Sequence, residues 1–177
     1  LAACQKAAGS GLVCAFPDGA ALVAAHIRGE KITGVPWYTL HKIFAGLRDA
    51  WQFGGSETAR AVLLRLADWA VVATQKLSDA AFETMLATEH GGMNEVLADL
   101  YVLTGKPDYR ALSERFSQKA VMEPASKARD TLDGMHANTQ VPKFVGFQRV
   151  YEINGDKSYG GAAAFFWRTV ARTRSYA

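Results

Sequence analysis

Three segments of the chain carry the same apolar pattern: LRDAWQFG at residues 47–54, LADLYVLTG at 97–105 and FQRVYEING at 147–155. The pattern recurs every fifty residues, and its apolar positions have the spacing of one face of an α-helix. Each segment ends at a glycine (Gly54, Gly105 or Gly155), and a second helical apolar run follows. The sequence therefore predicts three copies of a helix–turn–helix unit, and no long stretch alternates as a strand would.

The expected helices pair as antiparallel hairpins, because only two or three residues separate the two helices of each unit. Pro36 suits a first helical turn, and Ser56 suits an N-cap. Trp51, Tyr101 and Tyr151 should occupy equivalent places in the three hairpins. Long helices are expected at 37–53, 56–76, 92–104, 107–119, 139–153 and 158–174. Within residues 1–35 we expect one short amphipathic helix and then a loop around residues 16–19. Shorter helical segments are expected at 78–87 and near Ala125.

The composition excludes several classes of protein. With 49% hydrophobic and 21% charged residues, the 177-residue chain has an ordinary globular balance. Its net charge of +3 is small and scattered, which argues against nucleic-acid binding. No apolar run is long enough to span a membrane. Cys4 and Cys14 are too few for a disulfide framework and form no CxxC motif, so free thiols are expected. No HExxH, GxSxG or P-loop motif occurs.

Three histidines mark related places in the repeat. His41, His90 and His136 each lie at or before the start of the first helix of a unit. In a ring or solenoid these helix starts lie on one rim, so the three imidazoles could converge on one pocket. Each histidine could equally cap or pack against a helix end, and the sequence leaves both interpretations open.

Polar residues are concentrated at the same helix starts. The second unit opens with EHGGMNE at residues 89–95, where two glycines permit close approach of a ligand to the backbone. Glu89 and Glu95 could bind sugar hydroxyls or transfer protons. A glycine-rich helix start, with a partly buried Glu95 near the positive end of the helix dipole, is the simpler alternative.

The other two units show comparable sets. The third opens with HANTQVPK at residues 136–143, in which Asn138 or Thr139 could be a mere N-cap. The first contains Trp37 and Tyr38 beside His41. Aromatic rings next to hydrogen-bonding groups suit a sugar, although both rings would be equally ordinary as core residues.

These motifs resemble a known family. The segments VPWYTLHK (35–42), AGL (45–47), EHGGMNE (89–95) and HANTQVPK (136–143) are similar to the bacterial β-L-arabinofuranosidase group, glycoside hydrolase families 127 and 146. The resemblance implies an (α/α)6 toroid and the release of β-linked L-arabinofuranose, with retention, from an arabinofuranose-containing glycan. It also implies that His41 and His90 line the sugar subsite, and it extends less firmly to the other polar members of the motifs: Glu89, Glu95, His136, Asn138 and Gln140.

The resemblance implies catalytic residues outside the matched motifs. In the family, the nucleophile is a cysteine in a zinc site, a separate glutamate is the acid/base, and both follow the region matched here. We therefore expect residues 1–177 to be a single partial (α/α)6 domain, about half of the toroid, cut from a larger enzyme. No catalytic or metal-binding residue is assigned to it, and zinc is expected only in the full-length protein. A periplasmic or secreted location is what the family favours.

Two other classes stay open at this point. One is a different carbohydrate enzyme on an (α/α)6 toroid, an epimerase or a lyase, in which Glu89 or Glu95 would be the acid/base. The other is a helical-repeat interaction module, although its concave face would be apolar or charged rather than rich in His, Asn, Gln and Glu. The isolated chain is expected to bind no structural zinc, to hydrolyse no arabinofuranoside, and to associate through an exposed apolar face.

Overall fold

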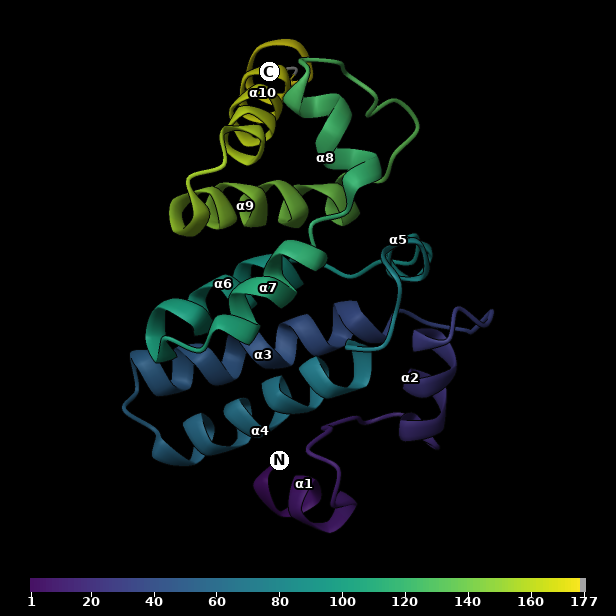
Figure 1. The fold of residues 1–177 in the computed structure, drawn as a ribbon, viewed down its shortest axis with the longest axis vertical. Helices are drawn as coiled ribbons and strands as arrows, with labels where there is room; N and C mark the ends of the chain where they lie inside the picture. The colour runs from purple at the N-terminus through teal and green to yellow at the C-terminus, as the bar shows by residue number, and fades with distance from the viewer. Residues whose placement is uncertain (176–177) are drawn as a thin grey trace. The chain divides into compact units, whose positions relative to one another are not determined.

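The computed structural model describes residues 1–175, and within them the protein is entirely helical (Figure 1). The all-α prediction is confirmed, and the helical hairpins agree with a toroid-type helical domain. The helices are α1 (Ala2–Ala8), α2 (Gly19–Ile27), α3 (Pro36–Gln52), α4 (Glu57–Thr74), α5 (Asp79–Leu86), α6 (Met93–Thr104), α7 (Pro107–Arg115), α8 (Lys119–Ser126), α9 (Ala137–Asn154) and α10 (Lys157–Thr173).

The chain divides into two compact units, the first comprising Leu1–His90 and the second beginning at Gly91. The first unit contains the hairpin α3–α4, and the second contains the hairpins α6–α7 and α9–α10. Each unit is described by itself below. The grouping of residues 1–177 into one partial toroid domain stays a prediction.

A glycine in the left-handed conformation follows the first helix of each hairpin. Gly55, Gly105 and Gly155 have φ of 64°, 73° and 72°. Residues with a Cβ atom rarely adopt this backbone conformation. The N–H groups of the three glycines donate to the carbonyls of Trp51, Tyr101 and Tyr151 at 3.0, 2.7 and 2.8 Å. The three aromatic residues therefore hold equivalent places in their hairpins. Gly54 and Gly55 follow the first helix, as expected, and Gly55 is the one that takes the left-handed conformation, at an interval of fifty from Gly105.

Two helices differ from those expected. The expected helix 107–119 stops at Arg115, and a separate helix, α8, begins at Lys119. Helix α2 was not expected, because Pro17, Asp18 and Gly19 indicate a loop. They do form a turn, with Asp18 at φ 52°, but the helix begins immediately afterwards.

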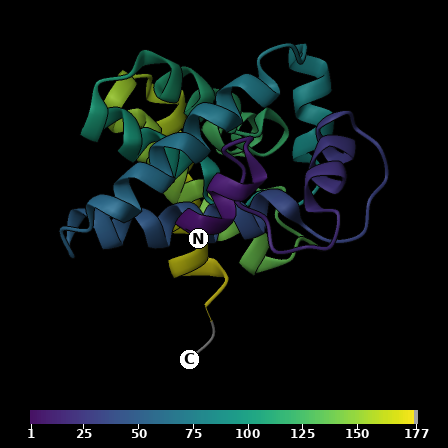
Figure 2. The ribbon, with the colours of Figure 1, turned by 90° about the horizontal axis from the view of Figure 1, so that it is seen from below.

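The core of the first unit forms where α3 packs against α4. Trp37 is fully buried, its indole Nε1 lies 3.1 Å from the sulfur of Met85, and its ring lies 5.9 Å from that of Trp69. Ser56 caps α4, as expected, by accepting from the Ala59 N–H at 3.2 Å. Helix α1 also packs against α4, and α2 contacts both α4 and α5 (Figures 1 and 2).

In the second unit, α6 packs against both α7 and α9, and α10 packs against α8 and α9. Phe144 and Phe147 on α9 are buried among residues of α8 and α10. The ring of Phe144 stacks on that of Phe166, with centroids 4.0 Å apart and planes within 8° of parallel. No helix in the described part of the chain is both long and apolar enough to cross a membrane.

Candidate functional site

The candidate residues are divided between the two units. His41, Glu89 and His90 belong to the first unit, and the second contains Glu95, His136, Asn138 and Gln140. All of them lie at or before the start of a first helix of a hairpin, except His41, which lies in the second turn of α3. The convergence of the two sets on one pocket stays a prediction.

His41 is a buried imidazole with a depressed pKa. Its side chain is 5% exposed, and its ring meets the ring of Tyr38 edge-on at 6.0 Å. Burial, together with the smaller effect of the nearby cations Lys42 and Arg48, lowers the His41 pKa to about 4. The imidazole is therefore neutral at neutral pH. A neutral imidazole can both donate and accept a hydrogen bond, which suits a sugar hydroxyl.

His90 ends the first unit and is fully buried. One ring nitrogen, Nδ1, lies 3.4 Å from the carbonyl oxygen of Thr88, which helps to orient the ring. Glu89, one residue earlier, is half-buried. These two residues lie in the connector that follows α5 (Asp79–Leu86) and precedes α6.

The side chain of Asn94, for which no separate role was predicted, stabilises the start of α6. Asn94 is fully buried, its Oδ1 accepts from the Glu95 N–H at 3.0 Å, and its Nδ2 donates to the Lys143 carbonyl at 3.1 Å. A Cβ at Gly146 would overlap the Asn94 side chain, so glycine is required there. Glu95 lies in the first turn of α6 and is half-buried, as expected.

The start of α9 presents its polar residues in different ways. His136 is the N-cap residue, and both His136 and Asn138 are exposed. The expectation that Asn138 or Thr139 is the N-cap is therefore wrong. Thr139 is instead buried, with its hydroxyl 3.5 Å from His136 Nδ1. Gln140 is half-buried, and its Oε1 is fully enclosed without a hydrogen-bond partner in residues 1–175.

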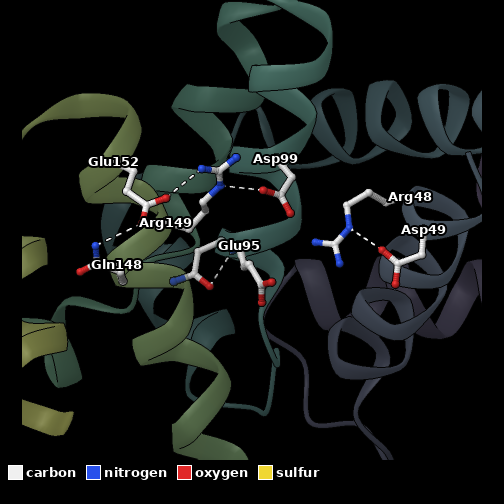
Figure 3. Close-up of polar contacts among 8 residues, drawn as sticks. Arg48, Asp49, Glu95, Asp99, Gln148, Arg149 and Glu152 are labelled. Atoms are coloured by element: carbon white, nitrogen blue, oxygen red, sulfur yellow. Dashed lines mark hydrogen bonds and ion pairs between the residues drawn. The ribbon is translucent and has the colours of Figure 1, made fainter. Parts of the chain in front are cut away.

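Three further polar contacts, made by Lys143 and Arg149, were not predicted from the sequence. Lys143 is 4% exposed, and its Nζ donates to Gln118 Oε1 at 2.7 Å, which ties α9 to the N-cap of α8. Arg149 lies between two carboxylates (Figure 3): its Nε donates to Asp99 on α6 at 2.7 Å, and its Nη1 donates to Glu152 at 2.8 Å. The interval of exactly fifty between Asp99 and Arg149 could have indicated this pair.

A groove of about 640 Å³ runs along the second unit between α9 and α10. We call it the α9–α10 groove. Its walls are largely apolar, and Glu95, Gln148, Arg149 and Glu152 supply its polar groups. Its apolar walls include Val141, Phe144, Val145, Phe166, Trp167 and Val170. A sugar ligand needs several hydrogen-bonding groups that converge on it. The largely apolar lining of this groove is therefore better suited to contact with a protein surface.

The described residues of this chain do not fit a zinc site. Zinc in proteins is held by three or four cysteine, histidine or carboxylate ligands. No group of three such side chains is suitably placed within residues 1–175. Cys4 is exposed, and Cys14 packs against Gly19. The zinc that the family resemblance implies therefore finds no ligand set in the described residues, and no step is assigned to it here.

Comparison with known proteins supports the resemblance seen in the motifs. No curated protein matches the chain. A family model described as β-L-arabinofuranosidase, GH127 catalytic domain, matches residues 1–177. The match spans both units and all three hairpins, so it rests on more than the polar motifs. The glycoside hydrolase class, and with it a glycan as the class of substrate, follows from this match. The chain thus belongs to the GH127 β-L-arabinofuranosidase catalytic-domain family.

Proposed function

We propose that this chain is the sugar-binding part of a retaining glycoside hydrolase that releases β-linked L-arabinofuranose from a glycan. The observation that carries the proposal is the family match along residues 1–177. The nucleophile and the acid/base are assigned to parts of the enzyme beyond these residues, together with the zinc site.

The geometry of His41 supports a binding role rather than acid/base catalysis. A general acid or base works best with a pKa near the working pH, and the His41 pKa of about 4 is far below neutrality. A neutral, oriented imidazole is instead suited to hydrogen bonds with sugar hydroxyls. Tyr38, which contacts the His41 ring, adds an aromatic surface of the kind that packs against the apolar face of a sugar.

The other candidates support the proposal to different degrees. His90 is buried and oriented by Thr88, and Glu89 precedes it. Glu95, His136 and Asn138 flank the starts of α6 and α9, where exposed or half-buried polar atoms can reach a ligand. Gln140 is the weakest candidate, because its Oε1 is enclosed beside apolar side chains.

The binding role is tested by titrating the chain with methyl β-L-arabinofuranoside and following its resonances by NMR. We expect His41→Gln and His90→Gln to weaken binding at least tenfold, which corresponds to about 1.4 kcal/mol. His26→Gln is the matched control, because His26 is equally buried in the same unit but lies in no motif. Equal effects of all three substitutions would refute the specific role of His41 and His90.

The proposal that this chain binds sugar but contains neither the catalytic residues nor the zinc site is tested on the 177-residue chain. The assay uses an aryl β-L-arabinofuranoside, and the zinc content is measured alongside. We expect neither turnover nor stoichiometric zinc. Turnover that survives removal of metal would place the catalytic residues within this chain. In an active enzyme that contains this domain, Glu89→Gln and Glu95→Gln should reduce activity without abolishing it. Complete loss with unchanged substrate binding would instead favour the epimerase or lyase class, with that glutamate as acid/base.

A further inference from the structure

Pro142 separates the first turn of α9 from the rest of that helix. Proline has no N–H to donate, and its ring crowds the carbonyl four residues earlier, so a helix is loosened or bent there. In α9 this carbonyl belongs to Asn138, and the first turn therefore lacks one of its helix bonds. His136 and Gln140 stand at the same end of the helix. The direction of these sugar-binding candidates thus depends on contacts other than the bonds within α9.

Lys143, the residue after the proline, is held from two sides. Its side chain is 4% exposed, and its Nζ donates to Gln118 Oε1 at 2.7 Å. Its carbonyl accepts from Asn94 Nδ2 at 3.1 Å. Gln118 and Asn94 are themselves buried, so water competes little for these bonds. Lys143 is therefore connected to α8 through its side chain and to α6 through its backbone.

The Gln118 side chain serves this contact rather than its own helix. Gln118 is the N-cap residue of α8, a position from which side chains commonly accept from the first helical turn, but it makes no such bond. Its partner, the ammonium of Lys143, loses hydration on burial, a cost that an apolar side chain would avoid. A buried contact of this kind can fix a geometry without adding stability.

The same contacts extend to the start of α6. Asn94, which donates to the Lys143 carbonyl, also accepts from the Glu95 N–H at 3.0 Å. Hydrogen bonds thus lead from Gln118 through Lys143 and Asn94 to the backbone of Glu95. The start of α6, which carries Glu95, and the start of α9, which carries His136, are both anchored close to Lys143.

We infer that Lys143 is a positioning residue of the proposed sugar site. Buried beside Gln118, it does not touch the sugar itself, and it sets the direction of the first turn of α9 relative to the start of α6. His136 and Asn138 on α9 and Glu95 on α6 are thereby brought to the same ligand. The inference rests on the proposed function, because it takes these three residues to bind sugar.

The test compares the 177-residue chain with Lys143→Met, Gln118→Met and the double variant. Affinity for methyl β-L-arabinofuranoside is measured by NMR titration, and stability by unfolding in urea. We expect each single substitution to weaken sugar binding about tenfold. The double variant should bind no more weakly than either single variant, because all three lose the same contact.

Stability separates positioning from a merely structural role. In the double variant two apolar side chains replace the buried polar pair, so the free energy of unfolding should return to about that of the parent chain. Affinity should nevertheless stay low. Affinity that recovers together with stability, or independent effects of the two substitutions on affinity, would overturn the inference.

Two further variants serve as controls. Arg149→Met breaks the contact between α9 and Asp99 of α6 that lies six residues beyond Lys143. It should lower stability and leave sugar affinity unchanged. Gln118→Glu keeps an acceptor for the ammonium and should bind sugar as the parent chain does. A Gln118→Glu chain that binds as weakly as Gln118→Met would contradict the role of this contact.

The direction of the first turn is also measured without sugar, from the amide chemical shifts of residues 136–140. Lys143→Met should change these shifts, and Arg149→Met should not. A parent chain that binds no sugar would refute the proposed function, and the role of Lys143 with it. A parent chain that binds sugar, together with a Lys143→Met chain that binds equally well or has unchanged shifts, would refute the role of Lys143 alone.

Discussion

Replacing Gly146 by alanine should destabilise the second unit, although the same change in most helices is stabilising. An added Cβ would overlap Oδ1, Cγ and Nδ2 of Asn94, which is fully buried between α6 and α9. The amide would have to move and give up its bonds to the Lys143 carbonyl and the Glu95 N–H. Each lost bond costs about 1 kcal/mol. Overpacking adds about 1–3 kcal/mol.

Helix propensity opposes this loss by about 1 kcal/mol, since alanine is favoured over glycine in a helix. The balance is a destabilisation of about 2–4 kcal/mol. Gly46 is the matched control, because it stands one hundred residues earlier at the same repeat position, in α3, with nothing within 4 Å of an added Cβ. We expect Gly46→Ala to stabilise by about 0.5–1 kcal/mol.

The assay is urea-induced unfolding followed by circular dichroism, with hydrogen exchange of α6 and α9 amides to locate the effect. The decisive variant is the double mutant Asn94→Ala/Gly146→Ala, in which the new methyl group occupies space vacated by the amide. It should be more stable than Gly146→Ala alone, although Asn94→Ala by itself is destabilising. A Gly146→Ala chain as stable as the parent, or no rescue by Asn94→Ala, would refute the close packing inferred here.

The remaining predictions concern protonation and helix ends. The folded His41 pKa of about 4 lies below the ordinary 6.5, so the unfolded state binds more protons between these pH values. Stability should therefore fall by up to about 3 kcal/mol as pH drops from 6.5 to 4, and the difference from His41→Gln in urea titrations should isolate this loss. A pH-independent difference would contradict the buried, neutral imidazole. Ser56→Ala should cost about 1 kcal/mol through the lost cap of α4, whereas a stability change near zero in the same titration would exclude the cap. Gly105→Ala, at φ 73°, should cost about 1 kcal/mol in thermal unfolding, and an unchanged midpoint would mean that the turn relaxes.

The hairpins were predictable because their signals are local. Apolar spacing, the serine cap and the glycine turns act within a few residues, and five of the six long helices lie close to the predicted bounds. The prediction failed for α2, where turn-forming residues stand immediately before a helix. Pro17, Asp18 and Gly19 form the expected turn, but nothing in them shows that a helix follows at once.

The candidate site was less predictable because its geometry depends on contacts between distant segments. The motif residues were recognisable as polar groups at helix starts, but their solvent exposure was not predictable. His90 is buried, whereas His136 and Asn138 are exposed to solvent. The Lys143–Gln118 contact joins residues on different helices with no fixed interval between them. Asn94 and Gly146 are ordinary residues in the sequence and acquire their importance only when α9 lies on α6.

The left-handed glycines also determine where the chain can change length. Gly55 stands nine residues after Gly46, and Gly155 stands nine residues after Gly146, the glycine against which the Asn94 side chain packs. One residue inserted within that interval in α9 would rotate Gly146 by about 100° relative to the turn, and its place opposite Asn94 would go to a residue with a side chain. Insertions between Ser126 and His136, ahead of α9, leave the interval unchanged. Natural length variation, domain insertion and affinity tags should therefore be tolerated in the connectors between hairpins and rejected within the hairpins themselves.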